Sequence, residues 1–250
     1  FKVPLSYKHL KIKHIKLHNG LHAILISNPK AQNSTAAMCV KSGYFDDPSG
    51  LPGLAHLCEH MLFAGTKLFP GKSAYYSSVL KHGGYCNAYT LSDSTMFQFS
   101  VPTKSMHDEV QPEYYHLLKM FASQFICPLF SVSSIKEEVN VVDQEHRANI
   151  GNMEKTFLHL LKYLATPDHP YKKFSTGNSE TLSSQTDKVL KAHLKSYFKS
   201  NFCGNNMVLA IHSDQSLHTL QKLVVAEFSS ISSGLDKWHL QILPKNIINT

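Results

Sequence analysis

The segment "GLAHLCEHMLFAGT", residues 53–66, constrains the fold most, because it places three ionisable side chains in an otherwise apolar run. Its leucines and methionine recur at the intervals of one helix face, and a loop rich in Gly and Pro precedes them. His56 and His60 are four residues apart and share a face of that helix, which Glu59 borders. A core accepts such side chains when they are paired, and a metal ion is one candidate partner.

The spacing H-x-x-E-H suits zinc in particular. Two imidazoles one helical turn apart can supply two nitrogen ligands of a tetrahedral Zn²⁺ site, which leaves Glu59 free to act as a base. Zinc lowers the pKa of bound water to about 7, and a neighbouring carboxylate can take its proton during attack on a peptide carbonyl. The motif therefore predicts peptide hydrolysis. The alternative is a pair of half-buried histidines salt-bridged to a carboxylate on an ordinary core helix.

A second pair with the same spacing, His14 and His18, leads to a different interpretation. Polar and apolar residues alternate around it, and the turn signal Asn19-Gly20 follows directly. On strands such histidines are not spaced as ligands, so we interpret them as part of a solvated face.

A third protein ligand is needed, and "EEVNVVDQEH", residues 137–146, offers the best candidates. Glu138 and Glu145 are seven residues apart and so share a helix face, where one could bind zinc and the other orient a ligand. Asp143 and His146 are rival ligands on spacing alone, and a solvated acidic helix face is the alternative for the whole segment.

Composition limits the other function classes. The chain has 250 residues, is 42% hydrophobic and carries a formal charge of +7, but Arg147 is the only arginine among its 25 basic residues. Proteins that bind nucleic acids rely on arginine to contact bases and phosphates. We therefore expect a solvated lysine surface and no nucleic-acid partner. We find no apolar run long enough for a membrane span and no signal peptide, although the sequence begins with Phe1 rather than Met. The five cysteines are odd in number and contain no C-x-x-C, which favours a cytoplasmic protein, with peripheral membrane association as a lesser option.

The order of patterned segments predicts an α+β fold, a mixed β-sheet with helices packed mainly on one face. Strands are expected in a hairpin over 11–27, at 35–43, in two runs within 85–101 and at 207–213. Helices are expected at 53–66, 73–84, 107–125, 133–150, 153–165, 186–199 and 216–229. We assign residues 1–233 to one catalytic domain and 234–250 to a linker.

Three blocks together resemble the insulysin-like zinc peptidases of the pitrilysin clan: "GLAHLCEHMLFAGT", "HGGYCNAYT" and "EEVNVVDQEH", in that order. The resemblance covers nearly the whole chain and implies a metallopeptidase-like α/β roll. The opening "FKVPLSY" together with "GLAHLCEHM" is most similar to the fungal branch, which processes prenylated mating-pheromone precursors.

The resemblance implies that the zinc ligands are His56, His60 and Glu145 and that the base is Glu59. It also implies that Glu138 is a supporting carboxylate and that Asn87 and Ala88 bind substrate beside the scissile bond. The peptide substrate is expected to bind in an extended conformation as an added β-strand.

Members of this family are built from several homologous domains or paired subunits, whose second half closes over the first and adds an Arg and a Tyr to the transition state. The present sequence holds a single such domain, so we interpret it as the catalytic N-terminal domain of a longer protein with a homologous C-terminal half. Two rival hypotheses are a non-catalytic scaffold or regulatory domain that keeps the fold, and a basic module for nucleic acid or a membrane surface.

Overall fold

The computed structural model describes residues 4–103 and 112–234. Its centre is one six-stranded sheet with the strand order β1-β2-β6-β3-β5-β4. The strands are β1 (Lys11–Lys16), β2 (His22–Ser27), β3 (Asn33–Val40), β4 (Tyr85–Thr90), β5 (Thr95–Pro102) and β6 (Met207–Ser213). Only β2 and β6 pair in parallel; every other pair of neighbours is antiparallel. The sheet is therefore mixed, as predicted.

Eight α-helices pack on or beside this sheet in the described part of the chain. They are α1 (Leu54–Phe63), α2 (Ala74–Lys81), α3 (Pro112–Ile126), α4 (Val132–Asn149), α5 (Met153–Leu164), α6 (Ser179–Leu182), α7 (Asp187–Asn201) and α8 (Leu217–Phe228). Four short 3-10 helices are η1 (Leu5–Tyr7), η2 (Tyr44–Asp46), η3 (Pro170–Lys172) and η4 (Gly204–Asn206).

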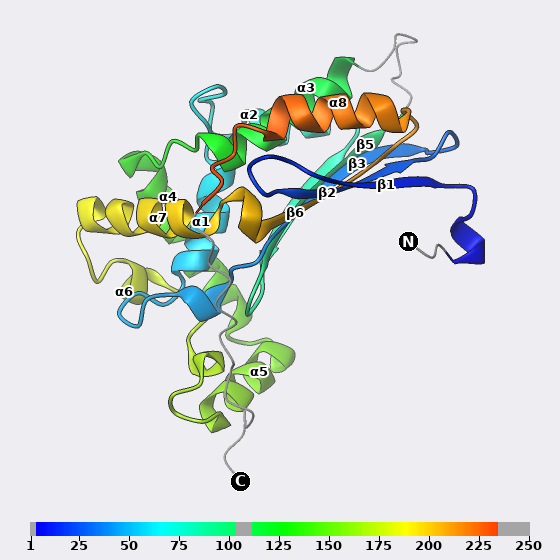
Figure 1. The fold of residues 1–250 in the computed structure, drawn as a ribbon. Helices are drawn as coiled ribbons and strands as arrows, with labels where there is room; N and C mark the ends of the chain where they lie inside the picture. Colours follow the sequence, from blue (N-terminus) through cyan, green and yellow to red (C-terminus); the bar gives the residue numbers. More distant parts are fainter. Residues whose placement is uncertain (1–3, 104–111, 235–250) are drawn as a thin grey trace.

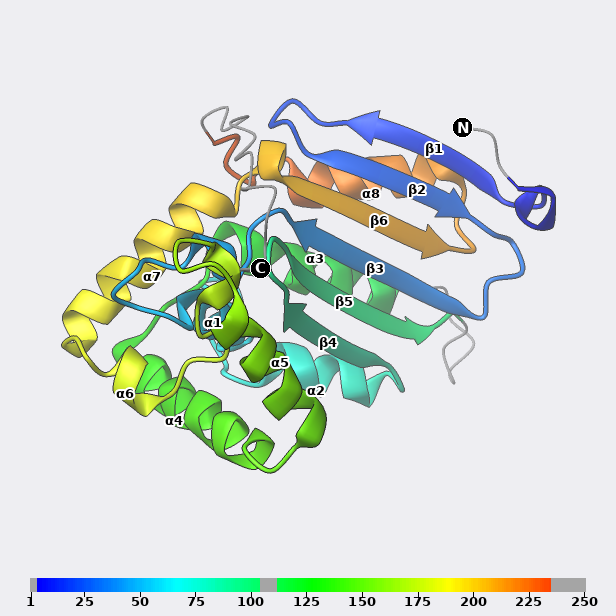
Figure 2. The same cartoon turned by 90° about the horizontal axis from the view of Figure 1, so that it is seen from below.

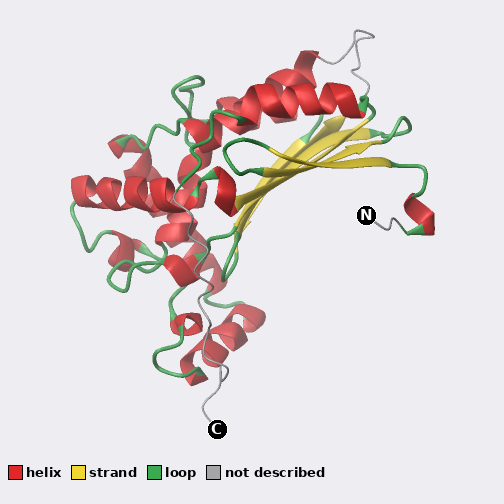
Figure 3. Cartoon of the chain, in the orientation of Figure 1, coloured by secondary structure: helices red, strands yellow, loops and turns green. Residues whose placement is uncertain are grey.

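The helices cover the sheet unevenly. Helices α3 and α8 lie along one face, and α1, α4 and α7 pack together beside one end of the sheet (Figure 1). Turned by 90°, the structure shows no described helix over β1, β2 and β6 on the opposite face (Figure 2). The same separation into a helical layer and a strand layer is plain when elements are coloured by type (Figure 3). The predicted α+β class with helices mainly on one face is confirmed.

The core lies between the sheet and the helices that cover it. Phe97 and Phe99 of β5 point to this side and are at most 1% exposed. Phe97 meets Phe125 of α3 at a ring-centroid distance of 5.2 Å, and Phe99 meets Phe121 of the same helix at 5.3 Å. These interlocking aromatic rings bury large apolar areas, and they fix the sheet against α3.

Several sequence predictions differ from the structure at their edges. The strand expected at 35–43 begins at Asn33 and ends at Val40, because the chain turns away after Val40 toward η2. The short helix α6 was not predicted, since four residues are too few to show a helical period. The first residues of the helix expected at 107–125, and residues 235–250 of the expected linker, lie outside the described residues.

Both histidines of the second pair were expected on strands, and one of them does not lie on a strand. His14 lies on β1, whereas His18 lies in the turn before β2. His14 instead stacks on His22 of β2, with ring centroids 5.1 Å apart. Both His14 and His18 are exposed, which agrees with a solvated face.

Candidate functional site

Helix α1 is anchored at its first turn by a distant carboxylate. Asp47 is buried and accepts hydrogen bonds from the backbone N–H groups of Gly53 and Ala55, at 2.8 and 2.7 Å. These N–H groups have no partner within the helix, so a carboxylate here both satisfies them and complements the helix dipole. On one side of α1, Leu54 and Leu57 are at most 1% exposed. The apolar stripe thus turns the two motif histidines and Glu59 away from the deepest core.

Gly53 is a position that only glycine can fill. Its φ of 92° lies in the left-handed region, and a Cβ at this position would be 2.4 Å from the Cα of Gly177. We expect Gly53→Ala to lower the free energy of unfolding by about 2 kcal/mol or more, because left-handed strain alone costs 1–2 kcal/mol and the backbone contact adds to it. Thermal unfolding measures this loss.

Gly50→Ala is the matched control, because an added Cβ at Gly50 meets nothing within 4 Å. Equal melting temperatures for the two alanine variants would contradict the prediction.

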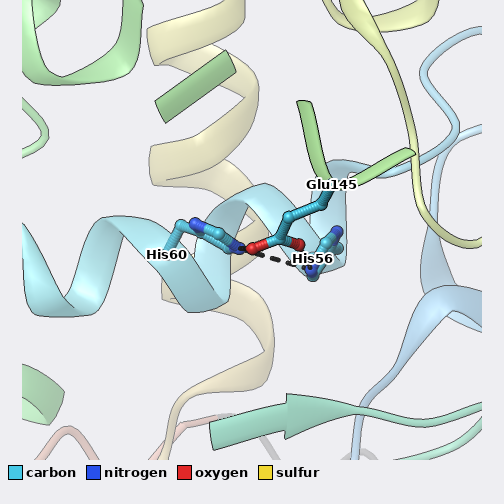
Figure 4. A group of neighbouring side chains, drawn as sticks. All are labelled: His56, His60 and Glu145. Carbon is cyan, nitrogen blue, oxygen red and sulfur yellow. Dashed lines mark hydrogen bonds and ion pairs between the residues drawn. The ribbon is translucent and has the colours of Figure 1, made fainter. Parts of the chain in front are cut away.

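Three side chains from two helices converge at the site. His56 and His60 come from α1, and Glu145 comes from α4 (Figure 4). The two histidine Nε2 atoms are 3.3 Å apart, and the carboxylate oxygens of Glu145 are 3.5 Å from His56 Nε2 and 3.6 Å from His60 Nε2. Within the described residues this is the one group of three or more His, Cys, Asp or Glu residues placed to hold a metal ion.

The separations fit a small divalent cation. Ligands about 2.0–2.1 Å from a tetrahedral ion are about 3.3 Å from one another, close to the observed distances. The donor set of two imidazoles and one carboxylate is the kind that zinc takes in catalytic sites. Burial, followed by the charge of His60, lowers the pKa of His56, which favours the neutral form that binds metals.

Both histidines are oriented by groups on the side away from the cluster. His56 Nδ1 donates to the backbone carbonyl of Thr176 at 2.8 Å, and His60 Nδ1 lies 3.1 Å from Glu138 Oε2. Each contact places the Nδ1 hydrogen on the outer side, so that Nε2 is the atom turned toward the cluster.

The carboxylate of Glu138 is itself held in place. Its other oxygen lies 3.2 Å from Lys72 Nζ. Although burial raises the pKa of Glu138, hydrogen bonds with His60 and Lys72 lower it overall. Against burial, hydrogen bonds with Glu138 and Glu145 raise the pKa of His60 to about 9. The negative charge that holds a proton on His60 would favour a cation at the same place.

Glu59 lies beside this cluster but is not one of the three converging groups. It is 7% exposed, and its Oε2 accepts a hydrogen bond from Thr90 Oγ1 at 2.6 Å. Burial raises the pKa of Glu59, while the Thr90 hydrogen bond and the charge of His60 lower it. A buried carboxylate that stays beside a candidate cation can accept a proton.

The rivals named for the third ligand are occupied elsewhere. Asp143 accepts hydrogen bonds from Arg147 Nε at 2.7 Å and from the backbone N–H of Ser179 at 2.9 Å. His146 packs its ring against Phe174, with centroids 5.0 Å apart. Neither side chain joins the cluster.

The expected substrate-binding residues line the same cavity. Asn87 and Ala88 of β4 face it together with Glu59 and the two motif histidines. Within the described residues, strand β4 is the edge strand of the sheet and pairs with β5 alone. An extended peptide could pair there as an additional strand.

Sequence reasoning missed the groups that orient the site. Thr90 is the last residue of the quoted block "HGGYCNAYT", and its hydroxyl could have been noticed as a partner for a buried carboxylate. No residue pattern could have shown Thr176, because it acts through a backbone carbonyl. The anchoring carboxylate Asp47 lies in the loop before the motif and was also not singled out.

Comparison with known proteins agrees with this fold. The family model described as insulinase, peptidase family M16, matches residues 22–172. The protein AXL1 of Saccharomyces cerevisiae is 40% identical over 235 residues, which are 92% of this chain and 19% of AXL1. The A-factor-processing enzyme of the same organism is 37% identical over 223 residues, covering 88% of this chain and 21% of the enzyme.

Among solved structures, pitrilysin matches with a TM-score of 0.83 at 28% identity, over 90% of this chain and 23% of pitrilysin. The chain belongs to the M16 insulinase family of peptidases. It spans about a fifth of the length of the two relatives above. No helix in the described ranges is both long and apolar enough to cross a membrane.

Proposed function

We propose that this chain is the catalytic domain of a zinc-dependent endopeptidase that hydrolyses extended peptides. The observation that carries the proposal is the convergence of two imidazoles and one carboxylate, at 3.3–3.6 Å, beside the buried carboxylate of Glu59. Membership of a peptidase family supports the reaction class. His56, His60 and Glu145 are the proposed ligands.

Zinc held by these ligands would supply Lewis acidity, which polarises a peptide carbonyl and makes water a better nucleophile. The remaining work falls to the chain itself. Glu59 accepts the proton of the attacking water and returns it to the leaving amine. Glu138 keeps His60 oriented, as its 3.1 Å contact with Nδ1 indicates.

The free edge of β4 is the proposed binding place for substrate. Backbone pairing along Asn87 and Ala88 would hold a peptide in the extended conformation whatever its side chains are, and would present one peptide bond to Glu59. This mode favours unstructured peptides as substrates. The similarity to the A-factor-processing enzyme supports a pheromone precursor as one such substrate.

We further propose that residues 1–233 form the catalytic domain, that 234–250 lead to further domains, and that a homologous C-terminal half completes the enzyme. The short span of the chain relative to its relatives supports this arrangement. The five cysteines form no disulfide within the described residues, which suits a reducing compartment, and a cytoplasmic location is part of the proposal.

Residues 1–250 alone are expected to bind zinc but to cleave peptides slowly. The proposed C-terminal half would close over the site cavity, and donors fixed in a water-excluded site commonly give the largest share of catalysis. Losing one such donor typically costs about 10²–10³ in rate. A quenched-fluorescence peptide assay on residues 1–250 and on the full-length protein measures the difference.

Addition of the C-terminal half, covalently or in trans, should restore the rate. Equal activity of the fragment and the full-length protein would contradict the proposed domain arrangement.

A non-catalytic scaffold with the same fold is the second candidate function. The intact cluster and the buried Glu59 argue against it, because a scaffold has no need of a carboxylate whose burial disfavours its charged form. Peptide cleavage by the full-length protein distinguishes the two.

A further inference from the structure

The hydroxyl of Thr90 makes a short contact with the proposed base. Thr90 Oγ1 donates to Glu59 Oε2 at 2.6 Å, a distance typical of a hydrogen bond to an ionised carboxylate. Among the described residues, the Glu59 side chain makes this one hydrogen bond, and its Oε1 atom makes none. One carboxylate oxygen is thus held, and the other is left for the cavity that Glu59 lines.

The donor is more rigid than the acceptor. Thr90 is the last residue of β4 and lies opposite Thr95 of β5 in the antiparallel register. Thr95 in turn donates from Oγ1 to the carbonyl of Ser42 at 2.8 Å, which ties this end of the ladder to the chain before η2. A β-branched side chain on a paired strand has restricted χ1, whereas a glutamate has three side-chain torsions to fix.

From this geometry we propose that Thr90 is a positioning residue for the proposed reaction: its hydroxyl fixes the carboxylate of Glu59 so that Oε1 faces the attacking water. The proposal rests on the assignment of Glu59 as the base. It also links the base to the substrate, because Thr90 lies on the same strand as Asn87 and Ala88. A peptide paired along β4 and the base that serves it are then set by one element.

A purely structural role for Thr90 predicts something different. A threonine at the end of a strand contributes through its β-branched shape, and valine has nearly the same shape without the hydroxyl. A structural residue would therefore tolerate Thr90→Val and respond to Thr90→Ser. A positioning hydroxyl responds in the opposite order.

The test measures kcat and KM of the full-length protein on a fluorogenic peptide. Thr90→Val is expected to lower kcat about 10- to 100-fold, the share of a hydrogen bond to a charged group, with little change in KM. Thr90→Ser is expected to stay near the parent. Zinc content and melting temperature should not change in either variant. Thr35→Val, a similar change on β3, is the matched control and should leave kcat at the parental value.

A double-mutant cycle shows whether Thr90 acts through Glu59. In a Glu59→Gln background, Thr90→Val should cause no further loss of kcat, because there is no charged base left to position. Parental kcat in Thr90→Val, equal losses in the valine and serine variants, or full additivity with Glu59→Gln would each overturn the proposal. If the valine variant does not fold, Thr90→Ala removes the same hydroxyl and takes its place in the cycle.

The same experiment separates this proposal from the one on which it rests. A parental rate in Glu59→Gln alone removes the proposed base, and with it the function assigned above. A large loss in Glu59→Gln together with no loss in Thr90→Val leaves the base in place and removes only the positioning role.

Discussion

Glu59→Gln is expected to lower peptide cleavage by the full-length protein by about 10²–10⁴, the usual share of general acid–base catalysis, while zinc stays bound. Glutamine has nearly the same shape and can still accept the hydrogen bond that Thr90 donates at 2.6 Å. It cannot take a proton from water. The loss should therefore appear in kcat. The zinc content should match the parent, because Glu59 lies beside the three proposed ligands rather than among them.

The control is Glu180→Gln, the same change on the exposed surface of α6, which should keep parental cleavage. The assay is steady-state cleavage of a fluorogenic peptide, with metal analysis of each preparation. Near-parental turnover of Glu59→Gln would remove the proposed base, and loss of its zinc would mean that Glu59 is itself a ligand.

Removal of the proposed third ligand, Glu145, should weaken zinc binding more than Glu59→Gln does. Glu145→Ala leaves two imidazoles, and two protein ligands do not hold a catalytic zinc. Removing a group that hydrogen-bonds a metal ligand typically lowers metal affinity by roughly 10- to 100-fold. Removing a ligand itself should lower the affinity for zinc by more than that, and peptide cleavage should be lost as well. Competition with a chromogenic chelator measures the affinity.

Two further variants of α4 turn this into a graded series. Glu138→Ala removes the contact at 3.1 Å from His60 Nδ1, and should cost about 10- to 100-fold in zinc affinity. His146→Ala should cost nothing, because that ring packs on Phe174 outside the cluster. If Glu145→Ala holds zinc as tightly as His146→Ala does, the third ligand has been assigned wrongly.

Much of the secondary structure followed from local pattern. The period of the leucines around His56 and His60 predicted α1, and the alternation within 85–101 predicted β4 and β5, because side-chain periodicity is set by the backbone geometry of each element. Boundaries were less accurate. They depend on where the chain meets other elements, as at the end of β3 after Val40.

The sequence by itself determined that two imidazoles share one face of α1 with a carboxylate beside them, since four-residue spacing on a helix admits no other arrangement. It could not choose a third ligand among Glu138, Asp143, Glu145 and His146, which all lie on one helix. The tertiary structure favours Glu145, because the packing of α4 against α1 brings Glu145 within 3.6 Å of both histidines and leaves Asp143 to bond Arg147.

Tertiary structure alone also supplied the groups that orient the site. The carbonyl of Thr176 and the hydroxyl of Thr90 are far along the chain from the side chains they hold, 120 residues from His56 and 31 from Glu59. Local periodicity reports on neighbours within an element, and such long-range contacts leave no trace in it. The residue types of the site could therefore be predicted from the sequence. Their geometry is set by the packing of the strands and helices against one another.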